Sequence, residues 1–233
     1  MYSKILLSYL QIFNTITTVI LNISPIFVII PVLKGRDIYT NIPFLMLFFN
    51  LLNATGWGCY WYRMSFLIPV ISNSICWIIS IIFCIIYLFF FSGKRASKFC
   101  LYIPLLLLTE AIIIFMSLYV LKMKIFGIIL IFFNILMFIA PGQNIVRVIK
   151  EKNHKLIPIS TTIVGIICSG GWLLFGIIVN DINCIIPNLI GLISSIFNTF
   201  IWIFFYVKAK IEKKRHQFYS EESIDKKNKV QIK

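Results

Sequence analysis

The stretch Pro141–Gly191, which reads PGQNIVRVIKEKNHKLIPISTTIVGIICSGGWLLFGIIVNDINCIIPNLIG, has a counterpart earlier in the chain. Thirty residues separate Pro158 from Asn188, and thirty separate Pro43 from Asn73. A repeated spacing decides the architecture before any residue is given a role. The sequence therefore predicts that the chain arose by duplication.

Two further pairs of residues follow the same repeat. Each of the two prolines is followed fourteen residues later by a tryptophan, Trp57 in the first half and Trp172 in the second. Another proline precedes each of them: Pro25 lies eighteen residues before Pro43, and Pro141 lies seventeen residues before Pro158. The agreement of three separate spacings favours a duplicated unit of several helices.

The composition places this unit in a membrane. Hydrophobic residues make up 60% of the 233 residues, and about 20 apolar residues suffice for one helix to cross a bilayer core. Seven stretches approach that length. They are predicted near 8–33, 43–62, 66–91, 101–121, 124–149, 157–179 and 183–207.

The predicted fold is an all-α membrane protein with seven transmembrane helices. Residues 1–91 form the first three-helix repeat and residues 124–207 the second. Because three helices reverse the direction of the chain, one more crossing must separate two repeats of the same orientation. Residues 92–123 supply this linker helix, so the bundles are parallel in a 3+1+3 order. Residues 208–233 form a basic tail that we expect to be disordered.

The formal charge of +14 is distributed unevenly. With the amino terminus outside, eighteen basic residues fall on the inner side and four on the outer side. Basic residues concentrate on the cytoplasmic side of membrane proteins. We therefore expect a cytoplasmic tail and a lipid bilayer, not nucleic acid, as the partner of this charge.

The chain carries no pattern typical of an enzyme or a metalloprotein. It has six cysteines but no CxxC pair, and neither a Gly-rich phosphate loop nor a Ser/His/Asp set is present. Packing within helices is the simplest role for such cysteines. We expect no catalytic activity, no metal and no cofactor.

The matched asparagines are the strongest candidates for binding a ligand. If an axis along the membrane normal relates the two repeats, Asn73 and Asn188 face each other across it. Their amides offer both donors and acceptors, which suits a neutral polyol better than an ion. The matched Trp57 and Trp172 offer flat faces on which a pyranose ring packs.

Prolines and one buried acid complete the candidates. Pro25 and Pro141 are predicted to kink their helices near the inner end. Pro43 and Pro158 stand at helix entries, where proline also fits for purely structural reasons. Glu110 is the single acid deep within a predicted span, and such a residue is either a proton carrier or a structural group.

Over residues 25–207 the chain resembles the SWEET, or saliva, family of sugar transporters. The residues that carry the resemblance are PGQNIVRVIKEKNHKLIP, Trp172 with Gly176, Asp181, and PNLIG at Pro187–Gly191. The first half matches through SPIF at Ser24 and IPF at Pro43. The family is a known example of two parallel repeats. The resemblance implies sugar uniport by alternating access.

The resemblance also assigns roles to residues. Asn73, Asn188 and Trp172 match the sugar site of the family, and Trp57 and Asp181 fall where its outer gate is expected. The four prolines match the family's inner proline tetrad. Further pocket positions are Ala54, where a serine is common, its counterpart Ser169, and the matched pair Leu21 and Met137. Two large side chains at the last pair narrow the cavity and favour a monosaccharide such as glucose, without deciding which sugar.

Two other functions stay open at this point. A proton-coupled carrier of the PQ-loop class, which moves amino acids or other small solutes, is supported by Glu110. Its Pro-Gln motif is absent, however, because Ile26, Phe44, Gly142 and Ile159 follow the repeat prolines. A seven-helix receptor has no evident need of a 3+1+3 duplication. We expect a plasma-membrane transporter, and the sequence leaves open whether it forms a homo-oligomer.

Overall fold

The computed structural model describes residues 4–24, 26, 30, 44–90, 94–157 and 159–231. Every element in these ranges is helical, which confirms the all-α prediction. The elements are α1 (Lys4–Ile23), α3 (Phe44–Arg63), α4 (Leu67–Phe90), α5 (Lys94–Phe115), the π-helical turn η1 (Met116–Val120), α6 (Met123–Glu151), the 3₁₀ turn η2 (His154–Leu156), α7 (Ile159–Val179) and α8 (Ile182–Gln231).

The helices are long and apolar enough for a membrane. Four of them, within the described ranges, meet both requirements for spanning a bilayer: α1, α4, α7 and α8. Helix α1 also has the polarity of a lipid-facing helix, because it buries Gln11, Asn14 and Thr17 and exposes Ile12 and Ile16. A soluble protein shows the opposite arrangement. The chain is a multi-pass membrane protein.

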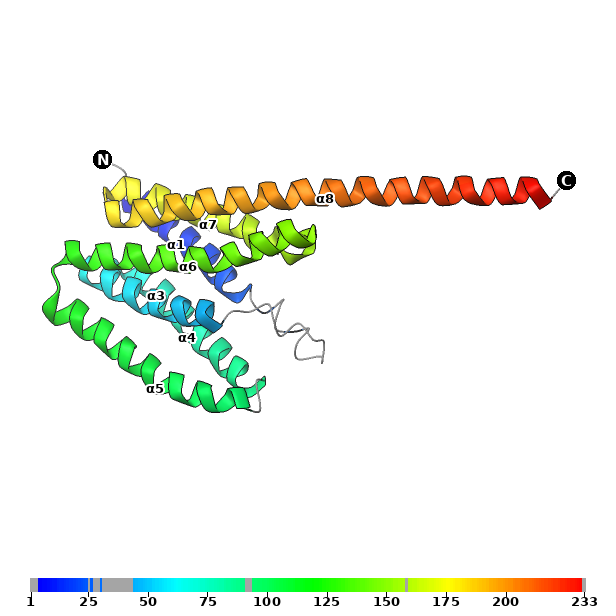
Figure 1. Ribbon diagram of the computed structural model, residues 1–233. Coiled ribbons are helices and arrows are strands. Elements are labelled where there is room, and N and C mark those ends of the chain that lie inside the picture. Colours follow the sequence, from blue (N-terminus) through cyan, green and yellow to red (C-terminus); the bar gives the residue numbers. More distant parts are fainter. Residues whose placement is uncertain are drawn as a thin grey trace.

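The helices pack in pairs that follow the duplication. Helix α4 packs against α1 and α3, and α8 packs against α6 and α7. Across the middle, α1 contacts α7 and α3 contacts α6. Exchanging α1, α3 and α4 for α6, α7 and α8 reproduces each of these pairs. Helix α5 stands at the edge of the molecule and packs mainly on α3 (Figure 1).

Two glycines allow the close approach across the middle. A Cβ atom placed on Gly171 of α7 would overlap the side chain of Asn14 of α1. A Cβ atom placed on Gly56 of α3 would overlap the side chain of Leu130 of α6. The glycines are 115 positions apart and their partners 116. Small residues let membrane helices approach closely, so the two crossings are the same contact made twice.

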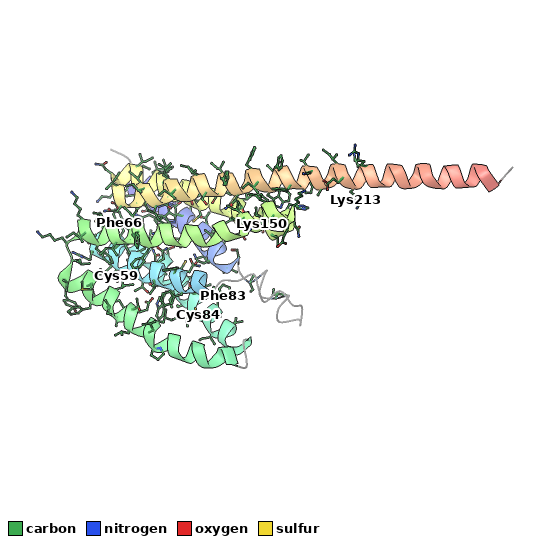
Figure 2. The ribbon with its side chains drawn as sticks, viewed as in Figure 1. Cys59, Phe66, Phe83, Cys84, Lys150 and Lys213 are labelled. Atoms are coloured by element: carbon green, nitrogen blue, oxygen red, sulfur yellow. The ribbon has the colours of Figure 1, made fainter. Side chains whose placement is uncertain are left out.

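The two ends of the bundle carry different side chains. Cys59 and Phe66 lie toward one end and Lys150 toward the other (Figure 2). The first end holds the turns that join α3 to α4 and α7 to α8, and we call it the turn end. Most of the buried aromatic core lies there. It corresponds to the side predicted to face outward.

The carboxyl-terminal tail differs from the prediction. Helix α8 continues to Gln231 instead of giving way to a disordered tail, and it projects well beyond the bundle (Figure 1). No glycine or proline follows Gly191. The tail is also rich in lysine and glutamate, which favour helices. Its charge prevents burial but does not oppose a helix.

Candidate functional site

The matched asparagines have the same local geometry in both repeats. Asn73 Nδ2 donates to the carbonyl oxygen of Pro69 at 2.8 Å, and Asn188 Nδ2 donates to that of Cys184 at 2.8 Å. Each bond joins a residue to the one four positions earlier, and each amide is half-buried. The carbonyl oxygen of each side chain stays available, and Asn188 Nδ2 has a second contact with Cys184 Sγ at 3.6 Å. No hydrogen bond joins the two amides to each other within the described part of the chain.

The matched tryptophans meet through a third tryptophan. Trp57 stacks on Trp61 with ring centroids 5.7 Å apart and an interplanar angle of 27°. Trp61 stacks in turn on Trp172 at 6.0 Å and 20°. Phe175 closes the group edge-on, at 5.5 Å from Trp61 and 5.6 Å from Trp172. This tryptophan stack of Trp57, Trp61 and Trp172 fills the space between α3 and α7.

A polar cluster lies beside the stack at the turn end. Tyr60 Oη donates a hydrogen bond to the carboxylate of Asp181, with both carboxylate oxygens at 2.9 Å. Asn183 Nδ2 donates to Tyr60 Oη at 3.0 Å, and the Asn183 backbone N–H donates to Asp181 Oδ1 at 3.1 Å. All three side chains are buried. The cluster ties the last turn of α3 to the first turn of α8, so it joins the two halves.

Trp172 is oriented by a hydrogen bond from its ring. Its Nε1–H donates to Thr18 Oγ1 of α1 at 2.7 Å. Thr18 Oγ1 itself lies 2.7 Å from the carbonyl of Asn14 and 3.3 Å from Cys168 Sγ. The position 116 residues after Thr18 is Asn134, a buried amide whose Nδ2 donates to the Leu130 carbonyl at 3.0 Å. A polar side chain therefore stands at the same place in both repeats.

The other expected pocket residues are only partly described. Ala54 and Ser169 are buried in equivalent turns of α3 and α7. Leu21 packs against the aromatic core. The side chain of Met137 lies outside the described residues, although its backbone belongs to α6. Among the four prolines, Pro141 lies within α6, and Pro25, Pro43 and Pro158 lie outside the described residues.

Glu110 is buried away from the matched residues. It lies on α5, where Oε2 accepts hydrogen bonds from Thr55 Oγ1 of α3 and from Trp77 Nε1 of α4, the latter at 3.3 Å. The site therefore ties the linker helix to two helices of the first half.

Sequence reasoning did not find Tyr60, Trp61, Asn183 or Thr18. The search for matched positions could not find the first two, because the positions 115 residues later hold Phe175 and Gly176. A helical spacing would have indicated them, since Trp57, Tyr60 and Trp61 share one face of α3. Asp181 therefore has Tyr60 as its partner, one turn beyond the Trp57 expected at the gate.

Comparison with known proteins places this chain beside sugar transporters. Residues 124–210 match the family described as "Sugar efflux transporter for intercellular exchange". A bidirectional sugar transporter of Arabidopsis thaliana, SWEET10, is 24% identical over 191 residues, which cover 78% of this chain and 64% of that protein. The sugar transporter SWEET1 of Dictyostelium discoideum is 34% identical over 61 residues, which cover 26% of this chain and 28% of that protein.

A solved structure agrees in fold. The structure of a eukaryotic SWEET transporter superposes with a TM-score of 0.77, covering 86% of this chain and 97% of that chain at 18% identity. These relatives are named as transporters, which agrees with the expectation that the chain is not an enzyme. The family match over residues 124–210, the relatives aligned with this chain and the shared fold all make this chain similar to the SWEET sugar transporters.

Proposed function

We propose that this chain moves a sugar across a membrane by uniport, with a monosaccharide such as glucose as the substrate. The family description and the names of the relatives supply the substrate class. The relative named as a bidirectional transporter supports movement down a gradient in either direction. The large side chain of Leu21 at the edge of the aromatic core supports a small sugar.

The observation that carries this proposal is the equal geometry of Asn73 and Asn188. Equivalent helices present both amides, and each donates to the carbonyl four residues earlier, while Asn188 Nδ2 also lies 3.6 Å from Cys184 Sγ. A bond of this kind fixes the side chain and leaves an acceptor and a donor for a ligand. In the proposal both amides bond to hydroxyl groups of one sugar, while the Trp172 ring covers an apolar face of it.

Alternating access requires a gate and a hinge. We assign the gate to the tryptophan stack and to the Tyr60–Asp181 hydrogen bonds, because both join the two halves at the turn end. The hinge is assigned to Pro25, Pro43, Pro141 and Pro158, which occupy matched positions in the sequence of the two halves. Opening the gate breaks the aromatic contacts of Phe175 with Trp61 and Phe66, the stacking of Trp61 on Trp172, and the polar cluster.

The sidedness and the membrane belong to the same proposal. The asymmetry of basic residues favours an outer turn end and a cytoplasmic α8 extension in the plasma membrane. Whether a single chain or a homo-oligomer transports the sugar is left to experiment. The competing proposal is a proton-coupled carrier of other small solutes, and the buried Glu110 is the observation that favours it.

Uptake of labelled glucose, fructose and sucrose into transporter-deficient cells tests the proposal. Glucose should enter down its gradient, leave preloaded cells equally well and be unaffected when a protonophore collapses the proton gradient. Uptake that the protonophore abolishes would instead support the coupled carrier. Failure to move any of the three sugars, with the protein present at the surface, would reject sugar transport itself.

A further inference from the structure

The carboxyl group of Glu110 has two unlike oxygen atoms. The side chain is 7% exposed. Oε2 accepts hydrogen bonds from Thr55 and Trp77, whereas Oε1 is fully buried and has no hydrogen-bond partner. A polar atom that is buried without a partner costs about 1–3 kcal/mol, and more if it is charged. The structure therefore leaves one oxygen of a single carboxyl group unsatisfied.

Among the side chains that the structure describes, none offers Glu110 a positive charge. The titratable side chains that face it are the thiols of Cys59 on α3 and Cys84 on α4. Arg63 lies two helical turns after Thr55 on α3. It does not pair with Glu110 but donates to the carbonyl oxygens of Ser117 and Leu121, the second at 2.8 Å. Within the described residues no basic side chain pairs with Glu110. A buried carboxylate without a cation is costly in a membrane.

A row of polar groups connects this carboxyl group to the turn end. Thr55, Cys59 and Arg63 follow one another at intervals of four on α3, so they share one face of that helix. Opposite them on η1 lies Ser117, whose Oγ is buried. Cys59 lies beside both Ser117 and Glu110. The π-helical turn that contains Ser117 is a feature often found at functional sites.

The second half of the chain has no such row. The positions 115 residues after Thr55, Cys59 and Arg63 hold Gly170, Leu174 and Ile178. The two halves share their helix pairs and their glycine crossings without it. The polar row is therefore not needed to build a three-helix unit, and it belongs to the linker helix and the first half alone.

We propose that Glu110 is a proton-binding site. A proton from the aqueous phase adds to Oε1 and removes the negative charge, while Oε2 becomes the carbonyl oxygen and keeps its bonds from Thr55 and Trp77. The side chains of the row supply hydroxyl, thiol and guanidinium groups between this site and the turn end. The proposal goes beyond sugar movement, because proton binding needs no sugar. The other reading of Glu110 is a fixed anchor that holds α5 on the first half and does not titrate.

Infrared difference spectra of the full chain in lipid nanodiscs, without sugar, separate these readings. As the pH is lowered, a carboxylic C=O stretching band of Glu110 should appear. The band should vanish in Glu110→Gln, whose amide still accepts the two bonds and preserves the fold, and persist in Glu212→Gln, which changes an exposed glutamate of α8. In Thr55→Val, which removes one donor to the carbonyl oxygen, the band should move to higher frequency.

Two results would overturn the proposal. If no pH-dependent carboxyl band is lost in Glu110→Gln, the residue does not take up a proton and serves only as an anchor. If the band is lost in Glu110→Gln but does not shift in Thr55→Val, the proton does not add at Oε1 as the hydrogen bonds require. Because the spectra involve no sugar, neither result depends on whether the protein transports one.

Discussion

Tyr60 and Asp181 lie 121 positions apart in the chain, yet their side chains share the hydrogen bonds that join its halves. The phenol is also edge-on to Trp57, with ring centroids 5.2 Å apart. Tyr60 thus takes part in both the hydrogen bonds and the aromatic contacts of the proposed gate. The two contributions can be tested separately, because replacing Tyr60 with phenylalanine removes the hydrogen bonds and keeps the aromatic contact.

Tyr60→Phe should loosen the turn end without dismantling it. A hydrogen bond to a charged group contributes about 1.5–3 kcal/mol, so a membrane-impermeant thiol reagent should label the buried Cys184 roughly tenfold to hundredfold faster. The measurement uses a background in which the other cysteines are alanine. Tyr62→Phe is the matched control, because Tyr62 is exposed on the same helix. Equal labelling in the Tyr60 and Tyr62 variants would remove Tyr60 from the gate.

Asn188→Ala and Asn73→Ala should each weaken sugar binding. The loss of one hydrogen bond, with its partner left dry, costs about 0.5–3 kcal/mol, which is roughly a threefold to hundredfold loss of affinity. The measurement is glucose binding by the purified protein, together with surface expression in cells. Asn198→Ala is the control, because Asn198 is on α8 but has Phe83 at its matched position. An equal loss in the control would make the asparagines packing residues.

At the scale of helices, the glycines decide how closely the halves approach. Gly171→Ala inserts a methyl group where Asn14 lies, and overpacking of this kind costs about 1–3 kcal/mol. The thermal unfolding temperature of the protein in detergent should therefore fall. Gly170→Ala is the adjacent control, since a Cβ there meets no atom within 4 Å. It should leave the unfolding temperature unchanged or raise it, because alanine favours a helix. If Gly170→Ala lowered the unfolding temperature more than Gly171→Ala, the close contact between α1 and α7 at Gly171 would be contradicted.

The helices show what the sequence could and could not predict. Four of the seven predicted spans, 43–62, 66–91, 124–149 and 157–179, match described helices within a few residues at both ends, because long apolar runs leave little choice of structure. Gly56 and Gly171 lie 115 positions apart, so the same repeat relates them, but only the fold gives their contacts. Tyr60 and Trp61 were missed because the two halves diverged there. The tail was wrongly expected to be disordered because its charge was weighed above its helix-forming residues.

At the scale of the whole molecule, the charge asymmetry predicts the orientation. An epitope after Lys233 should be reachable by antibody only in permeabilised cells, and one before Met1 should be reachable on intact cells. Inner loops and tail carry eighteen basic residues against four on the other side, and lysine and arginine resist transfer across the membrane. The reverse labelling pattern would place the proposed gate on the cytoplasmic side.

The length of α8 has a consequence for how motion of this molecule can be observed. Its 50 residues make a rod about 75 Å long, whereas the hydrocarbon core of a bilayer is only about 30 Å thick. The segment beyond the bundle therefore acts as a pointer fixed to the second half. A slight tilt of the packed part sweeps the free end through a wide arc. A pair of fluorescent dyes, one of them near Gln231, would report that tilt through a larger change in distance than any pair within the bundle.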